Sequence, residues 1–159
     1  MQNPFNHPAW IDISLLLSRL VLGLYVLLAG WSKMAGGMGK FVDGGFKAMT
    51  PEWLPEAVAR PYGYLIPIGE LLLGLMLILG LFSRIAAGLM TLLLLSIVIA
   101  MMNKNGVTGL ADAGGPPFHH AFVMLPMAFM LAIIGSGRLA LDPLYFAGGA
   151  PEGGGGKKK

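Results

Sequence analysis

Four long apolar runs dominate the sequence, and short polar or glycine-rich stretches separate them. The second run, YGYLIPIGELLLGLMLILGL, would rise about 30 Å as a helix, which is the thickness of the apolar core of a bilayer. The pattern therefore predicts an all-α integral membrane protein built as a bundle of four transmembrane helices. We expect the spans at residues 11–31, 62–81, 85–102 and 118–134.

The short connection between the second and third runs predicts an antiparallel hairpin, because it consists only of Phe82, Ser83 and Arg84. Gly80 suits the end of the helix formed by the second run, and Ser83 suits the N-cap of the helix formed by the third run. An even number of spans places both termini on one side of the membrane. Lysine and arginine are balanced between the two sides, so only the near-terminal Arg19 favours cytoplasmic termini.

The connection from Ser32 to Pro61 mixes aromatic and apolar side chains with charged ones. This mixture suits one or two short helices in the lipid headgroup layer, and a loop packed over the mouth of the bundle is the alternative. Either arrangement forms a lid on that side. We expect residues 1–147 to form a single transmembrane domain and residues 148–159, rich in glycine and lysine, to be a disordered tail.

Composition supports a membrane protein and excludes several other classes. Hydrophobic residues make up 55% of the chain and charged residues only 12%, against about 25% charged in a soluble domain. The absence of cysteine excludes disulfides, thiolate zinc sites and cysteine-ligated iron–sulfur clusters. The net charge of +3 comes partly from the final three lysines, so it indicates contact with anionic lipid rather than nucleic acid.

Glu70 is an ionisable residue near the middle of the second run, where it needs protein or trapped water as a partner. Arg19 is the best candidate, because it is the other strongly charged residue well inside an apolar run. Each of the two is followed four residues later by a glycine on the same helical face, which would let the helices approach closely. Counting from the helix ends places Arg19 about 12 Å and Glu70 about 16 Å from the terminal side.

Three interpretations of an Arg19–Glu70 pair stay open. The pair could lock the bundle together, form the polar floor of a ligand or quinone pocket, or take part in proton or ion translocation. Removing one partner of such a pair would leave the other charge buried and unpaired.

His119 and His120 open the fourth run on the lid side. Adjacent helical residues point about 100° apart, so the two cannot ligate one metal or haem iron along the same face. One of them could hydrogen-bond a quinone carbonyl or exchange a proton, and the alternative is an interfacial histidine satisfied by loop carbonyls. We predict no metal site.

Three segments together resemble the DoxX family of small bacterial membrane proteins. They are RLVLGLYVLLAGWSKM from Arg19, GELLLGLMLILGLFSRIAAGLM from Gly69, and IIGSGRLALD from Ile133, in which Ala140 stands where the family usually has serine. The resemblance extends over roughly residues 14–143. Arg19 and Glu70 match the family's own arginine and glutamate positions.

The resemblance implies a four-helix bundle in the bacterial inner membrane with a link to quinone-dependent oxidoreduction, because DoxX proteins are related to the DoxD subunit of thiosulfate:quinone oxidoreductase. It implies no catalytic residue. Quinone is the expected ligand, and lipids and a membrane redox complex are the expected partners; a homo-oligomer also stays open.

Three functions follow as hypotheses. The first is an accessory or structural subunit of a membrane redox complex, in which a partner transfers the electrons, since nothing in the sequence holds a redox cofactor. The second is a quinone-reducing subunit that acts on thiosulfate or a similar anion, with lid cations attracting the donor and Glu70, His119 or His120 handling protons. The third is an oligomeric small-molecule carrier.

Overall fold

In the computed structural model, residues 8–107, 120–135 and 140–141 are described, and every regular element among them is helical. The chain runs through α1, a short helical lid, α3, α4 and α5. The bounds of the long helices are Pro8–Ala35 (α1), Glu56–Leu79 (α3), Ser83–Asn105 (α4) and His120–Ile134 (α5).

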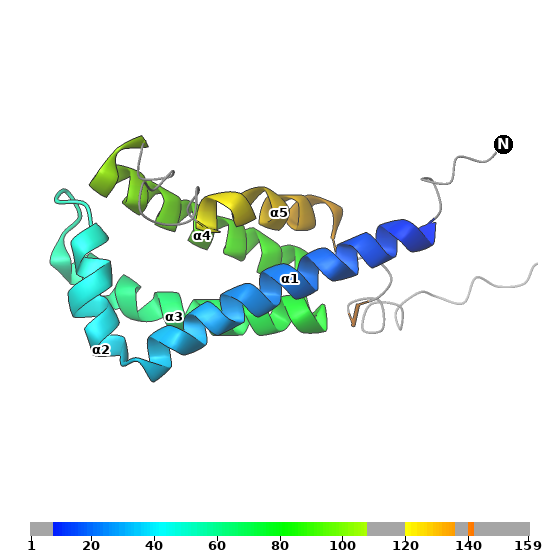
Figure 1. Ribbon diagram of the computed structural model, residues 1–159, viewed down its shortest axis with the longest axis horizontal. Helices are drawn as coiled ribbons and strands as arrows, with labels where there is room; N and C mark the ends of the chain where they lie inside the picture. Colours follow the sequence, from blue (N-terminus) through cyan, green and yellow to red (C-terminus); the bar gives the residue numbers. More distant parts are fainter. Residues whose placement is uncertain (1–7, 108–119, 136–139, 142–159) are drawn as a thin grey trace, which may run out of the picture.

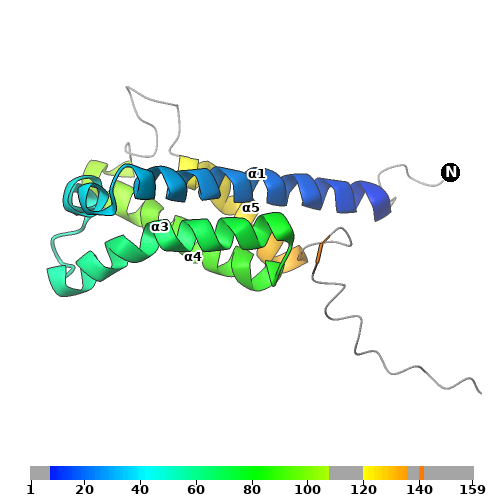
Figure 2. The ribbon, with the colours of Figure 1, turned by 90° about the horizontal axis from the view of Figure 1, so that it is seen from below.

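Successive long helices run in opposite directions, and they form two closely packed pairs (Figures 1 and 2). Helix α1 packs most extensively against α3, and α4 packs most extensively against α5. Because four helices alternate in direction, Pro8 and residues 140–141 lie at the same end of the bundle, which we call the terminal end. The lid lies at the opposite end, which we call the lid end.

Among the described residues, three helices are long and apolar enough to cross a membrane, which makes this a multi-pass membrane protein. Their spans are Ala9–Ala35, Glu56–Leu79 and Ser83–Asn103. Helix α5 is apolar but has only 15 residues, a rise of about 22 Å, which is less than the core of a bilayer. The structure thus supports three of the four predicted spans, and the fourth appears as a shorter apolar helix. Its predicted first residues, 118 and 119, fall outside the described part of the chain.

Large apolar side chains cover the outside of the long helices. Leu17, Leu28, Leu65 and Leu92 are examples that are each more than half exposed. A water-facing surface rarely carries so much contiguous apolar area, whereas a lipid-facing surface requires it. The interior is apolar as well, with Leu22, Leu77, Met90, Ala128 and Leu131 among its fully buried members.

Helix α3 begins at Glu56, six residues before the predicted start at Tyr62. The prediction placed the boundary at Pro61, but the helix continues through both Pro61 and Pro67. They are the sixth and twelfth residues of the helix, so each removes one hydrogen bond to the carbonyl four residues earlier, a loss that transmembrane helices tolerate where neighbouring groups compensate. Glu56 in the first turn also interacts favourably with the helix dipole.

Glycines bring α1 and α3 into backbone contact. A Cβ atom added to Gly23 would lie 2.8 Å from the carbonyl oxygen of Gly74, and one added to Gly74 would lie 2.8 Å from the carbonyl oxygen of Gly23. These distances are too short for any side chain. The small-residue spacing seen in the sequence therefore serves the close packing of these two helices.

The turn between α3 and α4 reverses the chain as predicted, with one difference in its caps. Gly80 adopts a left-handed conformation (φ 70°), and the N–H of Leu81 donates to the carbonyl of Met76, which closes α3 in the manner of a Schellman motif. Phe82, rather than Ser83, holds the N-cap position of α4, and no side-chain hydrogen bond caps that end.

The lid consists of short helical turns, as the sequence predicted. They are α2 (Met38–Lys40), a π-helical turn η2 (Phe41–Phe46) and a 3-10 turn η3 (Lys47–Met49). Two exposed ion pairs join the lid to the first turns of α3. The predicted boundary at residue 147 and the tail at 148–159 lie outside the described residues.

Candidate functional site

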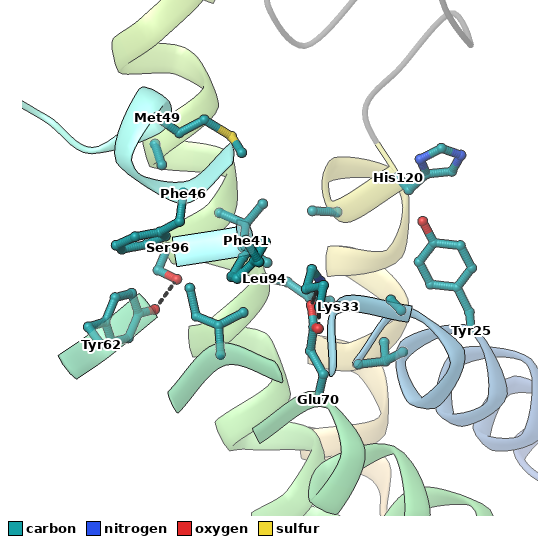
Figure 3. Close-up of a pocket in the computed structure, with 16 residues that line it drawn as sticks. Tyr25, Lys33, Phe41, Phe46, Met49, Tyr62, Glu70, Leu94, Ser96 and His120 are labelled. Atoms are coloured by element: carbon teal, nitrogen blue, oxygen red, sulfur yellow. Dashed lines mark hydrogen bonds and ion pairs between the residues drawn. The ribbon is translucent and has the colours of Figure 1, made fainter. Parts of the chain in front are cut away.

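A cavity of about 220 Å³ lies at the lid end, between the lid and helices α1, α3, α4 and α5 (Figure 3). Its walls are mainly apolar and aromatic, and a few polar side chains enter it from different helices. Lys33, Glu70, Tyr62, Ser96, Tyr25 and His120 are the polar members of the lining.

An ion pair between Lys33 of α1 and Glu70 of α3 forms one wall of this cavity (Figure 3). The Nζ atom of Lys33 lies 2.5 Å from each carboxylate oxygen of Glu70, so both oxygens accept a hydrogen bond. The side chain of Glu70 is 4% exposed and that of Lys33 is 24% exposed. Glu70 thus has the partner that a carboxylate in a transmembrane helix requires.

A glycine on α1 makes this pairing geometrically possible. A Cβ atom on Gly30 would lie 2.9 Å from the Cβ of Glu70 and 2.8 Å from the carbonyl oxygen of Pro67. The absence of a side chain at Gly30 lets α3 approach α1 there. Lys33 lies one turn further along α1, and its ammonium group therefore reaches the carboxylate of Glu70.

The structure does not bring the predicted partners Arg19 and Glu70 together. Arg19 is 1% exposed and lies at the terminal end, where a Cβ atom on Gly80 would collide with its Nη1 atom. Gly80 is ten residues from Glu70, so Arg19 lies about 15 Å away from Glu70 along the axis of α3.

The physical reason for the difference is the register of the two helices. The prediction measured the depth of Arg19 from a helix start at Ile11, as if that residue were level with the end of α3. In the structure α1 begins at Pro8 and its first turns extend past the end of α3, so Arg19 is level with Gly80 (Figure 1).

The lid covers the cavity with aromatic rings. The Nζ atom of Lys33 lies 5.4 Å from the centre of the Phe41 ring, a cation–π distance. Phe46 packs on Gly63, where a Cβ atom would lie 2.7 Å from the ring, and the ring centres of Phe46 and Tyr62 are 6.1 Å apart. The lid is therefore part of the cavity wall.

Two further polar groups line the cavity. The hydroxyl groups of Tyr62 on α3 and Ser96 on α4 form a hydrogen bond, and Figure 3 shows this pair apart from the Lys33–Glu70 pair. The rings of Tyr25 and His120 lie 5.5 Å apart. His120 thus lines the cavity as the sequence analysis anticipated for a candidate site residue, whereas His119 lies outside the described residues.

Lys33 was not predicted as the partner of Glu70, although two features of α1 indicate it. Lys33 lies on the helical face of Arg19, Gly23, Val26 and Gly30, at successive steps of four, three, four and three residues, and it stands three residues after a glycine that faces α3. Within the described residues, no group of three histidine, aspartate or glutamate side chains is arranged to hold a metal ion.

Comparison with known proteins places the chain in a family. The sequence model of the DoxX family matches residues 14–103, more than half of the chain. The chain belongs to the DoxX family. Both Lys33 and Glu70, and thus the ion pair of the cavity, lie inside the region that defines the match.

One relative of this DoxX protein is named "Putative oxidoreductase CatD", from Bacillus subtilis (strain 168). The two chains are 30% identical over 137 residues, which cover 86% of this chain and 90% of the relative. No solved structure matches this chain.

Proposed function

We propose that this DoxX protein is a small membrane subunit of a quinone-linked redox assembly, and that its lid-end cavity holds the ring of the quinone. The electrons come from a partner oxidoreductase in the same membrane. The observation that carries the proposal is the cavity itself, in which an apolar, aromatic wall surrounds the Lys33–Glu70 pair.

The size of the cavity suits a single substituted ring. An engineered apolar cavity of about 150 Å³ in another protein binds benzene. A volume of about 220 Å³ therefore admits one six-membered ring with small substituents, but it does not admit a macrocycle. Few polar groups in an otherwise apolar lining are the usual design of a small-molecule site.

The chemistry of the lining also suits a quinone. A quinone ring is flat and apolar on its faces, and its oxygens accept hydrogen bonds. Phe41, Phe46 and Tyr62 offer aromatic faces and edges, and Lys33 offers an N–H donor. Such a ligand also partitions into the bilayer in which this protein lies. The relative named as an oxidoreductase agrees with this class of function.

The alternative hypothesis of an anionic donor such as thiosulfate gains less support. It relies on the lid-side cations Lys33, Lys40, Lys47 and Arg60, but Lys33 is paired with Glu70, Lys47 lies 3.4 Å from Glu56, and Arg60 lies 3.4 Å from Asp43. Each pair cancels most of the field that would attract an anion. We therefore favour a partner protein over a small anion as the electron source.

Purification from native membranes in mild detergent tests the proposal. Mass spectrometry should identify a co-purifying oxidoreductase in fixed ratio, and solvent extraction should yield quinone from the same complex. A chain that purifies alone, without quinone, and that binds no added quinone would contradict the proposed function. A homo-oligomer carrying quinone but no partner would contradict the subunit role while leaving the cavity assignment in place.

A further inference from the structure

We propose that Lys33 is the residue that contacts the ligand in the lid-end cavity, by donating a hydrogen bond to an oxygen of a neutral ring. Glu70 is then a positioning residue, which holds the ammonium group in place. This inference rests on the proposed function and extends it by naming the contact atom and the ligand chemistry that it recognises.

A count of the hydrogen bonds within the pair leaves Lys33 with one unused N–H donor. An ammonium group has three N–H bonds, whereas an ionised carboxylate only accepts. Two donors of Lys33 face the two oxygens of Glu70 at 2.5 Å, and within the described part of the chain these are the only hydrogen bonds of its Nζ atom. One donor therefore remains for an acceptor in the cavity.

The exposed fractions of the two side chains support the same roles, in which Lys33 contacts the ligand and Glu70 positions Lys33. The side chain of Glu70 is 4% exposed and lies against the backbone of α1, whereas that of Lys33 is 24% exposed and lines the cavity beside the Phe41 ring. Of the two side chains that line the cavity, Lys33 is therefore the more accessible. A ligand that enters would meet Lys33 first.

Charge balance defines the class of ligand. Lys33 and Glu70 together carry no net charge, so a neutral acceptor can bind without leaving an uncompensated charge in an apolar cavity. A second anion would lie beside the Glu70 carboxylate and would be repelled. The site therefore favours a flat neutral ring that carries a carbonyl oxygen over a hydrocarbon ring or an anion.

A matched pair of probes tests this assignment. Duroquinone (tetramethyl-p-benzoquinone) and durene, the tetramethylbenzene of similar shape, differ chiefly in the two carbonyl oxygens. Their binding to the full-length protein in lipid nanodiscs can be measured by isothermal titration calorimetry, with empty nanodiscs as the blank. We expect the wild-type protein to bind duroquinone more tightly than durene.

The decisive variant is Lys33→Met, which keeps most of the apolar length of the side chain but removes the ammonium donor. A hydrogen bond to a charged group corresponds to about tenfold or more in affinity, so duroquinone binding should weaken by at least that factor. Durene binding should change less than threefold. Lys47→Met is the control, because Lys47 is also paired with a glutamate but does not line this cavity.

A second variant guards against misfolding of Lys33→Met. Lys33→Met/Glu70→Met removes both charges, leaves no lone carboxylate, and should show the same selective loss of duroquinone binding. If the wild type binds duroquinone and neither variant weakens it, the assignment of Lys33 is wrong although the cavity holds quinone. If the wild type binds no duroquinone, the proposed function itself fails.

Discussion

The two lysine–glutamate pairs of this chain offer a direct measurement of what burial adds to an ion pair. The pair Lys33–Glu70 is largely buried, with side chains 24% and 4% exposed, whereas the pair Lys47–Glu56 is exposed at 67% and 73%. We predict that Lys33→Met destabilises the protein by about 3 kcal/mol, because it leaves the Glu70 carboxylate buried without a partner.

The reverse change should be milder. Glu70→Met leaves an unpaired ammonium, but the partly exposed Lys33 side chain can turn its end toward water or headgroups. We therefore expect Glu70→Met to cost less than Lys33→Met, and the double variant to recover most of the loss. In a double-mutant cycle this recovery appears as a coupling energy of about 2 kcal/mol.

The same cycle at Lys47 and Glu56 is the control. The long distance of 3.4 Å and the high exposure predict a coupling energy of about 0–1 kcal/mol. Unfolding by titration with sodium dodecyl sulfate, followed by the fluorescence of the three tryptophans, gives the free energies for both cycles. Equal coupling energies in the two cycles would refute the argument that Glu70 depends on Lys33 for its burial.

Three further predictions concern packing and hydrogen bonds. Gly74→Ala should destabilise the protein by about 1–3 kcal/mol in the same detergent unfolding assay, because its Cβ would lie 2.8 Å from α1 backbone atoms. Gly88→Ala is the control and should be tolerated, because the space around its Cβ is open. Tyr62→Phe should cost about 1 kcal/mol in that assay through the lost hydrogen bond to Ser96, and no change would contradict this contribution. Gly80→Ala should lower the midpoint of thermal unfolding, because its left-handed φ and the nearby arginine leave no room for a side chain, and an unchanged midpoint would show that the turn adapts.

Much of the fold could be predicted because it depends on local patterns. The apolar runs of α1, α3 and α4 are long enough to be unambiguous, and the three-residue connection at Phe82 permits only a hairpin. Helix boundaries were less accurate, since the predicted span began with the apolar run at Tyr62, whereas α3 begins at Glu56 in the more polar sequence before it. The end of α5 at Ile134 agrees with the prediction, and the predicted residues 118 and 119 lie outside the described part of the chain.

The candidate site was predicted in part. The sequence showed that Glu70 needs a partner, because an isolated carboxylate in a bilayer is costly. It could not show which cation is the partner, since that depends on how far α1 slides along α3. The contacts of Gly23 with Gly74 and of Gly30 with Glu70 fix that register, and they select Lys33 over Arg19.

The interior of the bundle differs between the terminal end and the lid end. Between Arg19 at the terminal end and Glu70 in the middle of α3, the buried side chains of α1 and α3 include Leu22, Val26, Leu73 and Leu77, all of which belong to the apolar core. This apolar layer keeps water from reaching the cavity through the core of the bundle from the terminal side. Protons taken up or released by a ligand at Lys33 would therefore exchange with the compartment on the lid side. In a vesicle that holds the protein in a single orientation together with quinone and the proposed electron-donating partner, reduction of the quinone should therefore take up protons from one aqueous phase only.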